Sequence, residues 1–183
     1  ERQSGLPYHN PYALLIMACI TDQVEQQRLF NAVRTIPIIQ KKAAWANKWM
    51  DAALPFEERL VAFSCIEGIF FCGSFCAIYW IKEMHGEALP GLIVSNEYIM
   101  RDESTHTEFA ILLHSMLKSK CKYERFKAII TEAVELETEF ITEALPCRLI
   151  GMNAELMKQY IRYMANRQTQ MYGFTPVFDQ VSN

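Results

Sequence analysis

Glycine and proline are scarce in this sequence, since each occurs only 7 times in 183 residues. So few turn-forming residues exclude a fold of many short strands and tight turns, and they favour long helices. No segment alternates apolar and polar residues for long enough to predict a strand. We therefore predict an all-α fold that forms a single helical domain over residues 1–183.

An excess of positive charge is also lacking, because 18 Lys and Arg residues stand against 21 Asp and Glu residues. Without a basic surface, nucleic acid is not an expected partner. The 6 cysteines form no CxxC pair and are too few for a disulfide-stapled domain. The first twelve residues, ERQSGLPYHNPY, lack the apolar core of a secretion signal. These absences together predict a reduced, cytoplasmic protein.

One long apolar stretch conflicts with a cytoplasmic location. Residues 60–81, LVAFSCIEGIFFCGSFCAIYWI, are long enough to span a bilayer and contain a single ionisable residue, Glu67. A membrane span would bury this carboxylate at a substantial cost in free energy. The central helix of a large bundle is also apolar on all sides. We favour this second interpretation and expect no membrane association.

Proline and asparagine mark the ends of the periodic segments, as is typical of a helical bundle. The predicted helices cover residues 10–34 with a break near 21–22, a segment that opens at 37, and residues 55–86, 90–118, 123–145 and 153–173. Trp45 and Trp49 are predicted to be core or interface anchors. A mostly solvated acidic face is predicted for Glu135, Glu137, Glu139 and Glu143, of which Glu139 or Glu143 could reach inward.

Glu67 is the first candidate for chemistry. On a continuous helix its face is apolar, so that a lone carboxylate would have a raised pKa or would need a cation. From this helix alone two interpretations stay open: a core glutamate hydrogen-bonded to Ser64 or Ser74, or a metal ligand. The cysteines of the same helix lie about 140–180° away by helical spacing and are predicted to be packing residues: Cys65, Cys72 and Cys76.

The predicted helix over residues 90–118 contains a second pair of candidate ligands, Glu103 and His106. Residues three apart share a helix face, so a carboxylate oxygen and an imidazole nitrogen can converge on one ion. The motif Glu-x-x-His alone is common by chance. A Glu from one helix with a Glu-x-x-His from the next, however, is half of the ligand set of di-iron carboxylate bundles. We therefore predict that Glu67, Glu103 and His106 share one pocket.

With these residues in place, the sequence resembles the small (β) subunit of class I ribonucleotide reductase, and it is most similar to the eukaryotic and large-virus branch. The blocks around the candidate ligands read ERLVAFSCIEGIFFCGSFCAIYWIKEM and LPGLIVSNEYIMRDESTHTEF. Further similar blocks read KKAAWANKWM, EFITEALPCRLIGMN and LMKQYIRYMANR. The resemblance runs from residue 12 to about residue 174 and argues against a membrane span. It implies a ferritin-like helical bundle, of which this chain lacks the N-terminal helices.

The resemblance also implies roles for individual residues. Glu67, Glu103 and His106 match the family's ligands for its second iron. Tyr12 falls where the family has its radical-bearing tyrosine, and Asp102 matches a carboxylate of its radical-transfer chain. In the family, a di-iron centre and oxygen oxidise the tyrosine, and the radical passes to the large subunit. There it starts the reduction of ribonucleoside diphosphates to deoxyribonucleotides for DNA synthesis.

The segment before Tyr12 departs from the family pattern. The family has a Glu-x-x-His that ends four residues before its tyrosine, and these positions hold Gly5 and Tyr8 here. Glycine has no ligating side chain, and neutral tyrosine is a poor substitute for imidazole. Pro7 disfavours an intact helix at this point, and His9 has the right chemistry in the wrong register.

Two interpretations of the function therefore stay open. The chain belongs to an active reductase small subunit that works with the large subunit, or it is a degenerate, metal-poor paralogue that assists the assembly of an active small subunit. Either form is expected to be a homodimer or a heterodimer with another small subunit. For this polypeptide alone, the lost ligands predict no enzymatic activity, at most one weakly bound ion of iron or manganese, and no stable radical on Tyr12.

Overall fold

The structure is a computed structural model that describes residues 17–86, 89–143 and 152–179. Over these ranges it is helical and contains no strand, which confirms the predicted all-α class. Residues 17–19 are helical as well. The helices that follow are α2 (Gln23–Phe30), α3 (Ala32–Thr35), α4 (Pro37–Met50), α5 (Phe56–Gly68), α6 (Cys72–His85), α7 (Pro90–Met116), α8 (Tyr123–Glu143) and α9 (Ala154–Met171).

The segment predicted as one helix over residues 55–86 is divided into α5 and α6, so that prediction is wrong in its middle. Residues 69–71 separate the two helices. The N–H groups of Ile69 and Phe70 both donate to the carbonyl oxygen of Cys65, at N···O distances of 2.9 and 3.1 Å. The second bond spans five residues instead of four, which widens the turn and interrupts the regular helix. We call residues 69–71 the α5–α6 break.

Several helices begin at signals that the sequence contains. Asn153 precedes α9, and its side-chain oxygen accepts hydrogen bonds from the N–H groups of Glu155 and Leu156. Pro37 and Pro90 stand at the first positions of α4 and α7, where the missing N–H has no intrahelical partner to lose. These predicted starts are confirmed.

The helix predicted over residues 10–34 is interrupted twice in its described part. The break predicted near residues 21–22 is confirmed, because Asp22 is the N-cap of α2 and accepts a hydrogen bond from the N–H of Val24. A second interruption at Asn31 separates α2 from α3 and was not predicted. The predicted start of this helix lies outside the described residues.

The core of the bundle is built around α5, which packs against α4, α7, α8 and α9. Val61, Ala62 and Cys65 have no exposed surface. By length and composition the stretch Phe56–His85 could cross a membrane, but half of its most apolar window is buried within the structure. The core helix of a bundle has the same property, which agrees with the interpretation favoured above.

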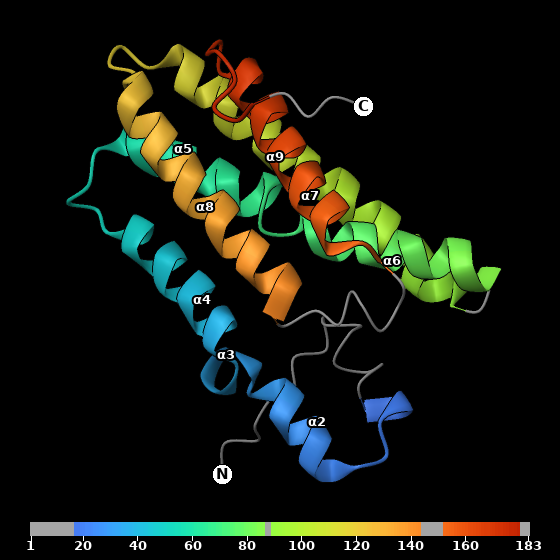
Figure 1. The fold of residues 1–183 in the computed structure, drawn as a ribbon. Helices are drawn as coiled ribbons and strands as arrows, with labels where there is room; N and C mark the ends of the chain where they lie inside the picture. Colours follow the sequence, from blue (N-terminus) through green and yellow to red (C-terminus); the bar gives the residue numbers. More distant parts are fainter. Residues whose placement is uncertain (1–16, 87–88, 144–151, 180–183) are drawn as a thin grey trace.

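Figure 1 shows α8 between α4 and α9, with α2 and α3 beyond one end of α4. Trp45 and Trp49 of α4 are buried, as predicted. The indole N–H of Trp45 donates to Oε2 of Glu132 on α8 at 2.8 Å. α5 also packs against α7, and these two helices carry the candidate ligands.

Candidate metal centre

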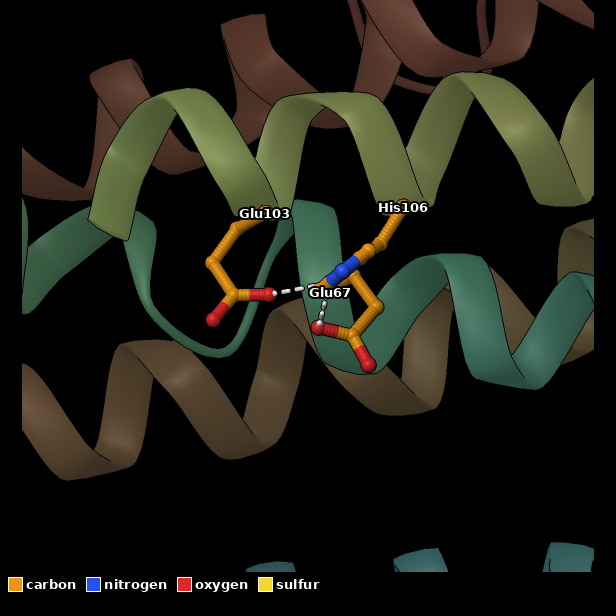
Figure 2. Close-up of side chains that lie close together, drawn as sticks. All are labelled: Glu67, Glu103 and His106. Carbon is orange, nitrogen blue, oxygen red and sulfur yellow. Dashed lines mark hydrogen bonds and ion pairs between the residues drawn. The ribbon is translucent and has the colours of Figure 1, made fainter. Parts of the chain in front are cut away.

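Glu67 lies in the last turn of α5, next to the two candidate ligands on α7 (Figure 2). His106 Nδ1 is 2.9 Å from Oε2 of Glu103 and 3.6 Å from Oε2 of Glu67. Each of the three residues offers one ligand atom, and these atoms all lie within 4.8 Å of one another. The spacing of three on α7 explains part of this geometry, because it places two side chains on one face. We call these three residues the candidate metal centre.

The two carboxylates are mostly buried, whereas the imidazole reaches the surface. The side chains of Glu67 and Glu103 are 15% and 19% exposed, and that of His106 is 54% exposed. Burial, reinforced by the neighbouring Glu103 carboxyl, raises the pKa of Glu67 to about 7. The hydrogen bond to Glu103 raises the pKa of His106 above its usual value. Near neutral pH the centre therefore retains protons that a cation would displace.

Close packing fixes the backbone beside the candidate metal centre. A Cβ atom on Gly68 would lie 2.7 Å from Oε1 of Gln168 and 3.1 Å from Oγ1 of Thr107. A larger residue at this position would require the side chains of Gln168 and Thr107 to move. Gln168 Nε2 donates to Oγ of Ser64 at 2.8 Å, and the same hydroxyl is hydrogen-bonded to Tyr172 at 2.8 Å. These bonds join α5 to α9 within one turn of the centre.

A cavity of about 360 Å³ opens beside the two carboxylates. Its wall includes Cys72 of α6, so the prediction that this cysteine lies on the far side from Glu67 is wrong. That prediction assumed a continuous helix. The wide turn in the α5–α6 break changes the helical phase by about one residue, or roughly 100°, so that Cys72 lines the same cavity as Glu67.

The donor set fits a single divalent cation. Two carboxylates and one imidazole are ligands that both iron and manganese accept. Three protein ligands leave the remaining coordination positions to water or to groups from elsewhere. The residues that the resemblance aligns with a second ligand set, Gly5 and Tyr8, lie outside the described residues. So do Tyr12 and His9, and the structure provides no geometry for them.

Asp102 and two further histidines lie outside the candidate metal centre. Asp102 is exposed on α7, directly before Glu103. His114 is buried, and its Nε2 accepts a hydrogen bond from the N–H of Cys121 at 3.1 Å. Burial lowers the pKa of His114. His85 is exposed at the end of α6.

One acidic residue was assigned wrongly from the sequence. Glu137 was predicted to be solvated, but it has no exposed surface and forms an ion pair with Lys42 of α4 at 2.6 Å. A signal for its burial is present in α8, because Glu137 continues a run of buried residues at helical spacing. These residues are Phe126, Ile129, Ile130, Ala133, Val134 and Ile141. The prediction placed Glu137 in solvent because it is acidic and did not use its position on the buried face of α8.

Comparisons with known proteins agree with the resemblance. The family model described as "Ribonucleotide reductase, small chain" matches residues 8–183. A ribonucleoside-diphosphate reductase small chain of Nicotiana tabacum is 50% identical over 168 residues, which cover 92% of this chain and 50% of that protein. Subunit M2 of Rattus norvegicus is 49% identical and is covered over 43% of its length. The chain thus spans about half the length of these relatives.

Solved structures give the same assignment of the fold. The Rnr4 homodimer of Saccharomyces cerevisiae matches with a TM-score of 0.83 and 30% identity, over 93% of this chain and 54% of that one. A structure from Bacillus halodurans described as a putative class I ribonucleotide reductase matches with a TM-score of 0.73 at 18% identity, which supports the fold alone. The ferritin-like helical architecture expected above is therefore confirmed.

Proposed function

Because the chain belongs to the small-chain family of ribonucleotide reductase, we propose that it acts in the reduction of ribonucleoside diphosphates to deoxyribonucleotides. In this proposal Glu67, Glu103 and His106 bind one divalent cation, iron or manganese. The observation that carries it is the convergence of the three ligand atoms within 4.8 Å of one another, from two helices. A bound ion of this kind would supply redox chemistry with oxygen.

The residues of the chain hold the cation by charge and by preformed geometry. Packing between α5 and α7 brings two carboxylates together before any ion binds, which is unfavourable unless a proton or a cation neutralises one of them. A divalent cation removes this repulsion and takes the place of the proton. The binding affinity should therefore rise with pH as Glu67 loses its proton near pH 7.

A second function is supported by the sequence before Tyr12. The positions that the resemblance aligns with the other ligand set are Gly5 and Tyr8, which are poor metal ligands. A chain with one ligand set should bind at most one ion, weakly, and should form no stable radical on Tyr12. Such a chain would assist an active small subunit as its partner in a mixed dimer. The large subunit would then bind to the mixed dimer.

Anaerobic titration with ferrous iron tests the proposal and separates the two functions. We expect one ion per chain, with binding abolished by Glu67→Gln and by His106→Ala. The control is Glu108→Gln, which changes an exposed carboxylate in the wall of the same cavity. Tight binding of two ions per chain, with a tyrosyl radical signal after oxygen is added, would favour the active subunit. Wild-type protein that binds no ion would refute the proposed centre.

A further inference from the structure

A buried ion pair contacts the α5–α6 break from α4 and α8. Lys42 Nζ lies 2.6 Å from Oε2 of Glu137, and the two side chains are 14% and 0% exposed. The ammonium group also lies over the rings of Phe70 and Phe140, at 4.8 and 4.2 Å from their centroids. Aromatic faces attract a cation, most strongly when it is desolvated. The pair is thus enclosed between helices and is not a surface salt bridge.

Both members of the pair also bond to the backbone at the break. Lys42 Nζ donates to the carbonyl oxygen of Phe70 at 2.7 Å. Oε1 of Glu137 accepts a hydrogen bond from the N–H of Gly73 at 3.1 Å. An interrupted helix leaves carbonyl groups at its end and N–H groups at the next start without intrahelical partners. Lys42 pairs with one of these carbonyl groups, and Glu137 pairs with one of these N–H groups.

Gly73 allows this close approach. A Cβ atom at this position would lie 2.6 Å from Oε1 of Glu137 and would overlap the side chain of Ile141. The start of α6 is therefore seated directly on α8, with the carboxylate as its hydrogen-bond partner. On the α7 side, a Cβ atom on Gly68 would lie 3.1 Å from Oγ1 of Thr107, which is a less tight contact. Gly68 and Gly73 stand on either side of the α5–α6 break.

We propose that Lys42 and Glu137 are positioning residues for the candidate metal centre, because they fix the α5–α6 break that follows Glu67 by two residues. A different geometry of the break would shift the last turn of α5 along α7. The carboxylate of Glu67 would then no longer lie beside His106. The inference rests on the proposed binding of a cation, and neither positioning residue contacts the cation itself.

A purely structural role makes a different prediction, and the chain provides a matched control. Lys48 of α4 and Glu132 of α8 form another ion pair between the same two helices, at 3.3 Å. Glu132 also accepts the hydrogen bond from Trp45. Neither Lys48 nor Glu132 bonds to the backbone of the break, although the ring of Trp45 lies 5.1 Å from that of Phe70. If the ion pairs only hold α4 against α8, the loss of Mn²⁺ affinity in each variant should follow its loss of stability, which is smaller for this half-exposed pair than for the buried pair.

The experiment measures the Mn²⁺ affinity of the purified chain, from the electron paramagnetic resonance signal of free Mn²⁺. It compares wild type with Lys42→Met and Glu137→Gln, and with the controls Lys48→Met and Glu132→Gln. We expect the first two variants to bind Mn²⁺ about 10–100-fold more weakly, the range found when a support of metal ligands is removed. The controls should stay within about twofold of wild type, since their pair does not touch the ligand turn.

Two further readouts separate positioning from loss of stability. Amide hydrogen exchange in the metal-free protein should increase at residues 66–75 in Lys42→Met and should stay near wild type elsewhere. The absorption bands of bound Co²⁺ should change in shape, because the arrangement of its ligands changes. If Lys42→Met does not fold, Glu137→Gln decides, because its amide oxygen still accepts the hydrogen bond from Gly73.

The outcomes are distinct. Wild-type protein that binds no Mn²⁺ refutes the proposed function and the positioning role together. Wild-type binding with unchanged affinity and unchanged Co²⁺ bands in both test variants refutes the positioning role alone. Equal losses in the test and control variants also refute it, because they show a general dependence on the packing of α4 against α8.

Discussion

Glu67→Gln should make the metal-free protein more stable above neutral pH, although it removes a proposed metal ligand. The pKa of Glu67 is about 7 in the fold against an ordinary value of 4.5. This difference corresponds to a cost of about 3 kcal/mol once the buried carboxyl is ionised. The pKa of Glu67 already includes its favourable contact with His106, and solvent at this partly exposed site screens part of the cost. We therefore expect a net gain of about 2 kcal/mol at pH 8.

The sign of the pH dependence follows from linkage. Since the folded protein holds the Glu67 proton more tightly than the unfolded chain does, this group favours folding at low pH, and the benefit is lost as pH rises through about 7. At pH 5 the cost in wild type falls below about 1 kcal/mol, because the carboxyl is mostly protonated in the fold. The advantage of Glu67→Gln should therefore shrink from pH 8 to pH 5.

Urea denaturation at pH 5, 6, 7 and 8, in chelator and then in excess Mn²⁺, measures these effects. In chelator the variant should gain stability with pH relative to wild type. In Mn²⁺ the order should reverse, because only wild type gains stability from binding. The control Glu108→Gln should track wild type in chelator. A variant that is less stable than wild type at pH 8 in chelator, or whose difference does not change with pH, would refute the reasoning.

Three further substitutions test the packing that supports the site. Gly73→Ala should lower the free energy of unfolding in urea by about 1–3 kcal/mol, because the new Cβ overlaps Ile141; an unchanged value would contradict the close approach. Asn153→Ala should lower the same free energy of unfolding by about 1 kcal/mol, because α9 loses its N-cap; an unchanged value would contradict this cap. Gln168→Leu should lower the melting temperature in calorimetry, since the buried Ser64 hydroxyl loses one of its hydrogen-bond partners; an equal or higher value would count against that bond.

The parts of the structure that sequence reasoning predicted are those set by residues close together in the chain. The start of α9 depends on one capping residue, Asn153, whose bonds reach only to the next turn. The starts of α4 and α7 depend on Pro37 and Pro90. The juxtaposition of Glu103 and His106 likewise follows from a spacing of three on one helix. Local physics was sufficient for each of these features.

The α5–α6 break could not be predicted in this way, because the groups that satisfy it come from distant parts of the chain. Within residues 55–86 no proline interrupts the helix after its start, and the apolar pattern continues across the break. The carbonyl of Phe70 and the N–H of Gly73 are paired with Lys42 and Glu137, from helices on either side in sequence. Only the packed bundle brings these four groups together, so tertiary contacts override the local helical preference.

The comparison of Glu67 with Glu137 shows which observation distinguishes a ligand site from a structural ion pair. Burial raises the pKa of both glutamates to about 7, so the pKa alone does not separate them. Their neighbours do, because Glu137 faces the ammonium of Lys42 and is compensated within the chain. Glu67 instead faces a second carboxylate, that of Glu103, and a surface imidazole. The ammonium of Lys42 offsets part of the cost of burying Glu137, whereas two adjacent carboxylates are stabilised by a cation from outside. The same bundle thus holds one closed charge pair at the break and one open charge cluster beside it, and the closed pair keeps the open cluster in place.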